Sequence, residues 1–135
     1  MHRVAAGLMV LVFAVSGLVQ AQPWRSAADS GNALFRTGKT ARAVEVYMRA
    51  VDGAGNIETR DSLYEKILER TAMFLLNNGK AREAEEYSFR LLRYRERVLG
   101  PATLSTVSAV NAYALSCYYT GKYAEAEDGY TRALD

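Results

Sequence analysis

The dipeptide Gly-Lys occurs three times in this chain at almost equal intervals. It stands at residues 38–39, 79–80 and 121–122, so the spacing is 41 residues and then 42. Each glycine has a small residue seven positions before it, an apolar residue four before it, an alanine five after it and another apolar residue twelve after it. Such a period is typical of repeat proteins, in which each repeat is one supersecondary unit that stacks on its neighbours.

The repeated positions predict two helices that pack antiparallel around a tight turn. Small residues on both sides of the turn let the helix axes approach closely, and glycine ends the first helix with a positive φ at no steric cost. Apolar stripes at helical spacing follow two of the turns: Ala43, Val46, Tyr47 and Ala50 in the first repeat, and Tyr123, Ala126, Tyr130, Ala133 and Leu134 in the third. We predict helices over residues 24–37, 40–52, 61–78, 81–98, 103–119 and 123–134.

Caps and helix-breaking residues set these boundaries. Residues 53–56, Gly-Ala-Gly-Asn, predict a flexible connector after the second helix. Ser62 followed by Glu65 predicts a capping box at the start of the third helix. Gly100-Pro101 is expected to stop the fourth helix because proline cannot continue it.

The repeats resemble the tetratricopeptide repeat (TPR). The resemblance is strongest in the third repeat, over residues 118–127 (YYTGKYAEAE), Tyr130 and residues 132–134 (RAL). The period of about 42 and residues 91–100 (LLRYRERVLG) are similar to the kinesin-light-chain type of repeat. The resemblance covers roughly residues 24–135. It implies an all-α fold, a right-handed superhelical stack of three helix-turn-helix repeats at about 24–52, 61–99 and 103–135, within a domain of residues 22–135.

The first 21 residues have the pattern of a secretory signal peptide. Met1-His2-Arg3 gives a short positive start, residues 4–15 are almost wholly apolar, and Val19-Gln20-Ala21 provides a cleavage site after Ala21. The alternative is an uncleaved membrane anchor, but the apolar run of 16 residues is shorter than the roughly 20 that a spanning helix needs. We therefore expect an exported protein, periplasmic or secreted, with no stable membrane span after processing.

The charged and reactive residues exclude several classes of function. Seventeen Lys and Arg against fifteen Asp and Glu leave a net charge of +2, too little to favour a nucleic-acid partner. The only histidine, His2, would leave with the signal peptide, so histidine-based nucleophile systems and imidazole zinc sites are not expected. We predict no catalytic residues, no metal site and no cofactor. Cys117, the only cysteine, is expected to be a buried apolar residue, the alternative being an intermolecular disulfide.

Three motifs suggest chemistry but have a simpler structural interpretation. Residues 37–40 (TGKT) resemble the end of a phosphate-binding P-loop, but helix rather than strand is expected before them, so no nucleotide is predicted. The glutamates at 83, 85 and 86 or at 125 and 127 could serve a carboxylate-dependent cell-envelope hydrolase, but residues two apart on a helix point to different faces. Arg90, Arg93 and Arg97 form a basic edge, interpreted as an exposed helix face that could dock an acidic partner.

The TPR resemblance implies that the first helix of each repeat lines a concave groove that binds a peptide or protein. The candidate groove residues are Asn32, Arg36, Lys66, Met73, Asn77, Asn111, Leu115 and Tyr118, with Phe35, Leu76 and Tyr119 on the same faces. Asparagine suits such a groove because its amide both donates and accepts hydrogen bonds. These residues predict a non-enzymatic adaptor; the alternatives are the envelope hydrolase and an N-terminal fragment of a longer TPR protein.

The last helix is followed directly by Asp135, and no polar helix follows to cover the face that carries Tyr123 and Tyr130. Terminal repeats normally have a polar outer face. We therefore expect self-association through this helix, a partner that covers it, or further repeats in a longer chain.

Overall fold

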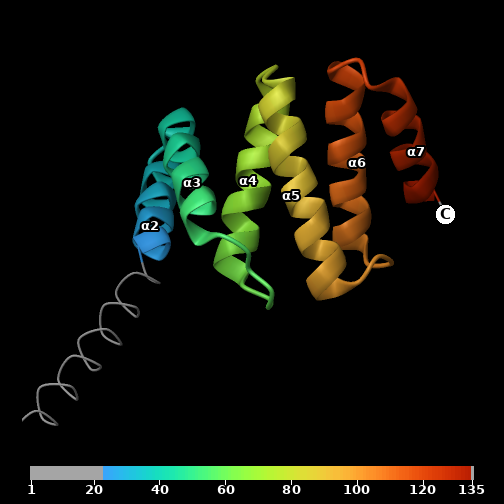
Figure 1. Cartoon of the computed structure of the whole chain (residues 1–135). Helices are drawn as coiled ribbons and strands as arrows, with labels where there is room; N and C mark the ends of the chain where they lie inside the picture. The colour runs from blue at the N-terminus through green and yellow to red at the C-terminus, as the bar shows by residue number, and fades with distance from the viewer. Residues whose placement is uncertain (1–22, 135) are drawn as a thin grey trace, which may run out of the picture.

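The computed structural model describes residues 23–134, which form six α-helices and no β-strand (Figure 1). The helices are α2 (Pro23–Arg36), α3 (Thr40–Ala54), α4 (Ser62–Asn77), α5 (Ala81–Leu99), α6 (Leu104–Tyr119) and α7 (Tyr123–Leu134). The all-α prediction is confirmed, and every predicted helix boundary lies within two residues of the observed one. The expected signal peptide, residues 1–21, and Asp135 lie outside the described residues.

The helices pair in chain order as three hairpins, α2–α3, α4–α5 and α6–α7, which lie side by side in Figure 1. The second helix of each hairpin also packs on the first helix of the next, and the first helices contact one another in the order α2, α4, α6. None of the helices in residues 23–134 combines the length and apolar character that crossing a membrane requires.

The three Gly-Lys turns have the same hydrogen-bonded geometry. In the first, the amide of Gly38 donates to the carbonyl of Phe35 (3.1 Å) and the amide of Lys39 donates to the carbonyl of Leu34 (3.0 Å), with a φ of 80° at Gly38. This is a Schellman motif, which satisfies the carbonyls that the end of a helix leaves free. Residues 79–80 and 121–122 repeat both bonds, with φ values of 73° and 82° at the two glycines. The amides that a P-loop would direct at phosphate are therefore occupied by helix carbonyls.

Two local predictions between the first and second hairpins are wrong. The predicted capping box of Ser62 and Glu65 is not formed, because Asp61 is the N-cap of α4 and its carboxylate accepts from the amides of Leu63 and Tyr64, each at 3.1 Å. Aspartate caps a helix as well as serine does, and it lies one position earlier. The predicted connector also begins too early, since Gly53 and Ala54 continue α3 and the chain leaves the helix at Gly55, with a φ of 67°.

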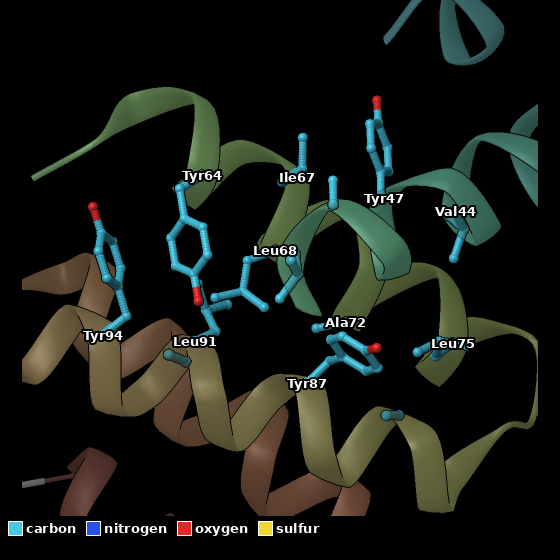
Figure 2. Close-up of a cluster of buried hydrophobic side chains, with 14 of the residues drawn as sticks. Val44, Tyr47, Tyr64, Ile67, Leu68, Ala72, Leu75, Tyr87, Leu91 and Tyr94 are labelled. Carbon is cyan, nitrogen blue, oxygen red and sulfur yellow. The ribbon is translucent and has the colours of Figure 1, made fainter. Parts of the chain in front are cut away.

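The core lies where the hairpins face one another, as Figure 2 shows for α3, α4 and α5. The largest side chains that are essentially inaccessible to solvent are Tyr47, Tyr94, Ile67, Leu68, Leu75 and Leu91. The repeated small residues are buried at the helix contacts: Gly31, Ala72 and Ala114 before the turns, and Ala43, Ala84 and Ala126 after them. The small positions of the repeat thus mark where the helices of each hairpin approach most closely.

A buried arginine links the second and third hairpins. Arg95 on α5 is only 5% exposed and makes ion pairs with Glu65 (Nε to Oε1, 3.1 Å) and Glu69 (Nη2 to Oε2, 3.0 Å) of α4. Its Nη1 also donates to the carbonyl of Ser105 on α6 (3.0 Å). One guanidinium therefore joins α4, α5 and α6, and it uses the fork of donors that only arginine has.

Cys117 lies in α6 and is fully buried, as the sequence predicts. Burial raises the pKa of its thiol, and the thiolate is the reactive form. We expect the native protein to react with iodoacetamide on the order of a hundredfold more slowly than the protein unfolded in guanidinium, because labelling requires local opening. Mass spectrometry of timed aliquots measures both rates, and equal rates would show that the thiol is accessible.

Candidate binding groove between the first two hairpins

An open groove of about 420 Å³ lies between α2 and α4, and we call it the α2–α4 groove. Its lining residues are Phe35, Thr40, Lys66, Glu69, Arg70, Met73, Phe74, Asn77 and Asn78. The volume falls within the range of ligand sites in proteins, and the lining combines apolar surface with amide and charged groups.

Helix α4 supplies most of the groove because its two faces differ. Lys66, Arg70, Met73 and Asn77 follow one another at steps of four, three and four, so they share one face of the helix. The opposite face carries the buried residues Ile67, Leu68, Thr71 and Leu75, which fix the rotation of α4 against α3 and α5. The packing of the core thus turns the Lys66 face toward α2.

One wall of the groove is held in place by Arg70. Its guanidinium lies over the ring of Phe35 at 4.0 Å, a cation–π contact. Its Nη1 donates to Asn32 Oδ1 (3.0 Å) and to the hydroxyl of Tyr47 (3.1 Å), and that hydroxyl also donates to Asn32 Oδ1 (2.6 Å). Since Arg70 is fixed by three side chains from the first hairpin, this wall is preorganised.

Met73 and Lys66 are free to meet a ligand. Met73 is 41% exposed and offers an adaptable apolar contact. Lys66 makes no ion pair within residues 23–134, whereas Glu69 is paired with Arg95. The groove therefore presents an apolar surface with uncompensated positive charge beside it.

The structure brings together only some of the predicted groove residues. Lys66, Met73 and Asn77 line the α2–α4 groove. Asn32 lies behind its wall, where both of its hydrogen bonds use the amide oxygen. Arg36 is exposed at the end of α2 and does not line the groove.

The three predicted residues of α6 form a separate stripe. Asn111 and Tyr118 are exposed and Leu115 is half-buried, at steps of four and three along the helix. The ring of Tyr118 packs against those of Tyr119 and Tyr123, with centroid distances of 5.7 and 5.5 Å. This aromatic cluster belongs to the turn of the third hairpin, and none of its members lines the α2–α4 groove.

Five of the groove residues are not predicted from the sequence: Thr40, Glu69, Arg70, Phe74 and Asn78. Arg70 could have been found from its place on the same helix face as Lys66 and Met73. Its contacts with Phe35 and Asn32 could not, because they depend on how the first two hairpins are placed in space.

The other candidate chemical groups have structural partners. Arg90, Arg93 and Arg97 line a second pocket of about 380 Å³ beside Asp52 and Tyr64. Arg90 pairs there with Asp52 (2.7 Å) and with Glu86 (3.0 Å). Arg95, on the same helix, does not line this pocket and is buried.

Two of the carboxylates considered for hydrolysis, Glu85 and Glu86, have structural partners. Glu85 forms an ion pair with Lys122 and accepts a hydrogen bond from Thr120 (3.0 Å). Glu86 pairs with Arg90 on the same helix. Within the described residues, no group of three or more His, Cys, Asp or Glu side chains is arranged to hold a metal ion.

The α2–α4 groove is therefore the candidate site, because it combines an open shape with an exposed methionine and an unpaired lysine. Comparisons of the chain with protein-family models, with curated proteins and with solved structures found no match.

Proposed function

We propose that this chain is an exported, non-enzymatic adaptor that holds a peptide or protein segment in the α2–α4 groove. The observation that carries the proposal is the groove itself: an exposed methionine and an unpaired lysine next to a wall that Arg70 has already ordered. Preorganisation favours binding because less conformational entropy is lost when the ligand arrives.

The lining favours a particular kind of ligand. Met73 and Phe35 provide apolar area, Asn77 can pair with a peptide backbone, and Lys66 favours a carboxylate. We therefore propose an extended peptide with an aliphatic side chain and an acidic residue near it.

The wider architecture in this proposal is a right-handed superhelical stack of TPR-like hairpins, with the first helices on the concave side. It is supported by the three identical Schellman turns, the buried small residues in the same register, and the contacts of α2 with α4 and of α4 with α6. Export rests on the pattern of residues 1–21.

A peptide library displayed on phage, selected against the expected mature chain from Gln22, tests the groove. Selected peptides are then measured by fluorescence anisotropy against the double variant Met73→Ala/Asn77→Ala. We expect the dissociation constant to rise about tenfold or more. This corresponds to a loss of roughly 1.4 kcal/mol of binding free energy, as expected when a central apolar contact is truncated.

The matched control is Asn111→Ala/Tyr118→Ala, which removes the same kinds of group from the exposed stripe on α6. Its affinity should stay within about twofold of the original. If Asn111→Ala/Tyr118→Ala loses binding and Met73→Ala/Asn77→Ala does not, the peptide site lies on α6 instead. A library that yields no binding peptide would reject the proposed groove. Circular dichroism checks that both variants keep their helix content.

A further inference from the structure

The outer face of α7 exposes residues whose counterparts in the other repeats are buried. The Gly-Lys register makes Leu134 equivalent to Val51 and Leu92; Leu134 is 89% exposed, whereas Val51 and Leu92 are 2% and 3% exposed. Tyr130 is 37% exposed, whereas its counterparts Tyr47 and Ser88 are buried. The equivalent face of α3 is covered by α4, and that of α5 by α6. The surface of α7 is thus shaped to receive the first helix of another hairpin.

The contact between the second and third hairpins shows which polar groups such a junction uses. Glu85 of α5 pairs with Lys122 and accepts from Thr120 Oγ1, both in the turn of the third hairpin. In the repeat register Glu127 of α7 is equivalent to Glu85, and it is exposed. The first junction lacks this contact because Val44 stands at the glutamate position.

The partners for Glu127 are present at the other end of the molecule. Thr37 and Lys39, exposed in the turn of the first hairpin, are equivalent to Thr120 and Lys122. The hydroxyl of Thr37 lies against the carbonyls of Ala33 (3.2 Å) and Leu34 (3.0 Å), as that of Thr120 lies against the carbonyls of Ser116 and Cys117 (3.1 Å each). The turn of the first hairpin therefore has the same local geometry as the turn of the third hairpin, which binds Glu85.

The end face of the first hairpin also fits a helix in shape and charge. A shallow groove of about 530 Å³ runs between α2 and α3, with Ser30 and Ala33 as small exposed residues and Leu34 and Val46 as apolar ones. Small residues let a helix come close. Arg49 also lines this groove, and the repeat register makes it equivalent to Arg90 and Arg132. Each of those two arginines pairs with a carboxylate of the preceding hairpin: Arg90 with Asp52 (2.7 Å) and Arg132 with Glu96 (3.3 Å).

We propose that copies of this chain associate end to end, with α7 of one copy against the first hairpin of the next in the register of the internal repeats. Glu127 of one copy then pairs with Lys39 and Thr37 of its neighbour, and Tyr130 and Leu134 are covered. Such a contact joins two different surfaces, so it leads to open chains or closed rings rather than to a two-fold dimer. It involves neither Met73 nor Asn77, so it is independent of the proposed peptide site.

Sedimentation velocity of the expected mature chain, at about 10–500 µM and low salt, tests the proposal. We expect weak association because each copy contacts its neighbour through a single hairpin junction, so the weight-average sedimentation coefficient should rise throughout this range. Glu127→Lys and Lys39→Glu should each weaken association about tenfold or more, because each places like charges at the junction.

Mixing the two variants provides the decisive measurement. The lysine introduced by Glu127→Lys meets the glutamate introduced by Lys39→Glu. At the other junction, the unchanged Glu127 of the second variant meets the unchanged Lys39 of the first. The mixture should therefore recover association, with the two variants alternating along the chain. The control Glu125→Lys makes the same charge change on α7 next to the pocket that faces the preceding hairpin, and it should associate like the original.

Three results would overturn the proposal: a protein that stays monomeric at the highest concentration, association that stops at a dimer and ignores both variants, or a mixture that does not recover. A monomeric protein would leave the α7 face to a further repeat or to a different protein. Circular dichroism of each variant, whose changed side chains are exposed, confirms that the helices are intact.

Discussion

Replacing Arg95 with alanine is expected to lower the free energy of unfolding by about 3–5 kcal/mol. The side chain is 5% exposed and pairs with Glu65, itself only 15% exposed, so the variant leaves a carboxylate with little solvent and no partner. The bond to the carbonyl of Ser105 is lost as well, and with it a link from α5 to α6. Urea unfolding followed by circular dichroism measures the change, which would be a large part of the total stability of a domain of this size.

The matched control is Arg93→Ala, two residues earlier on the same helix. Arg93 is 58% exposed and its nearest carboxylate oxygen, on Glu96, is 3.7 Å away, so its removal should cost less than about 0.5 kcal/mol. Adding Glu65→Gln to Arg95→Ala should recover part of the lost stability, because it removes the unpaired charge. Equal effects of Arg95→Ala and Arg93→Ala would show that the buried ion cluster does not hold the hairpins together.

Replacing Gly31 with alanine should destabilise the protein by about 1–3 kcal/mol, although the same exchange inside a helix normally stabilises. A Cβ at this position would lie 2.6 Å from Cδ1 and Cε1 of Tyr47. That ring cannot move aside easily, because it is fully buried and its hydroxyl is bonded to Asn32 and Arg70. Thermal and urea unfolding of the variant measure the loss.

Gly53→Ala is the control for this prediction. Gly53 lies in α3, and its nearest neighbour to a new Cβ, the Cβ of Trp24, is 3.9 Å away, an ordinary contact. We expect a gain of up to about 1 kcal/mol from the better helix propensity of alanine. The two substitutions are chemically identical, so a gain at both positions would mean that the ring of Tyr47 is not packed tightly between α2 and α3.

The helices and their order could be predicted from the sequence because their determinants are local. Helix period, glycine at the turn and proline after a helix act through hydrogen bonds and steric contacts between residues a few positions apart. The error at the start of α4 has the same local origin, since the adjacent residues Asp61 and Ser62 can each cap a helix and the structure uses Asp61. The burial of Cys117 followed from its place in the repeat.

The candidate site was predicted less completely. Lys66, Met73 and Asn77 were found from the first-helix face of the second repeat, and the structure places them in one groove. Asn111, Leu115 and Tyr118 occupy matching helical positions on α6 but lie outside that groove, because equivalent positions in a repeat share a helix face without sharing a cavity. Arg36, one residue beyond Phe35, is turned away from the groove that Phe35 lines.

The sequence by itself determined that residues 23–134 form helical hairpins and where each hairpin turns, because these features depend on neighbouring residues along the chain. Only the tertiary structure decided which charged side chains are buried, which are free, and which surfaces stay uncovered. Arg95 and Glu65 are 30 residues apart, and Arg70 and Asn32 are 38 apart. Contacts between residues so far apart in the sequence exist only after the hairpins have packed. The core that includes Tyr47, Leu68 and Leu91 sets the rotation of each helix. That rotation decides which partners the side chains on the other face of the helix meet.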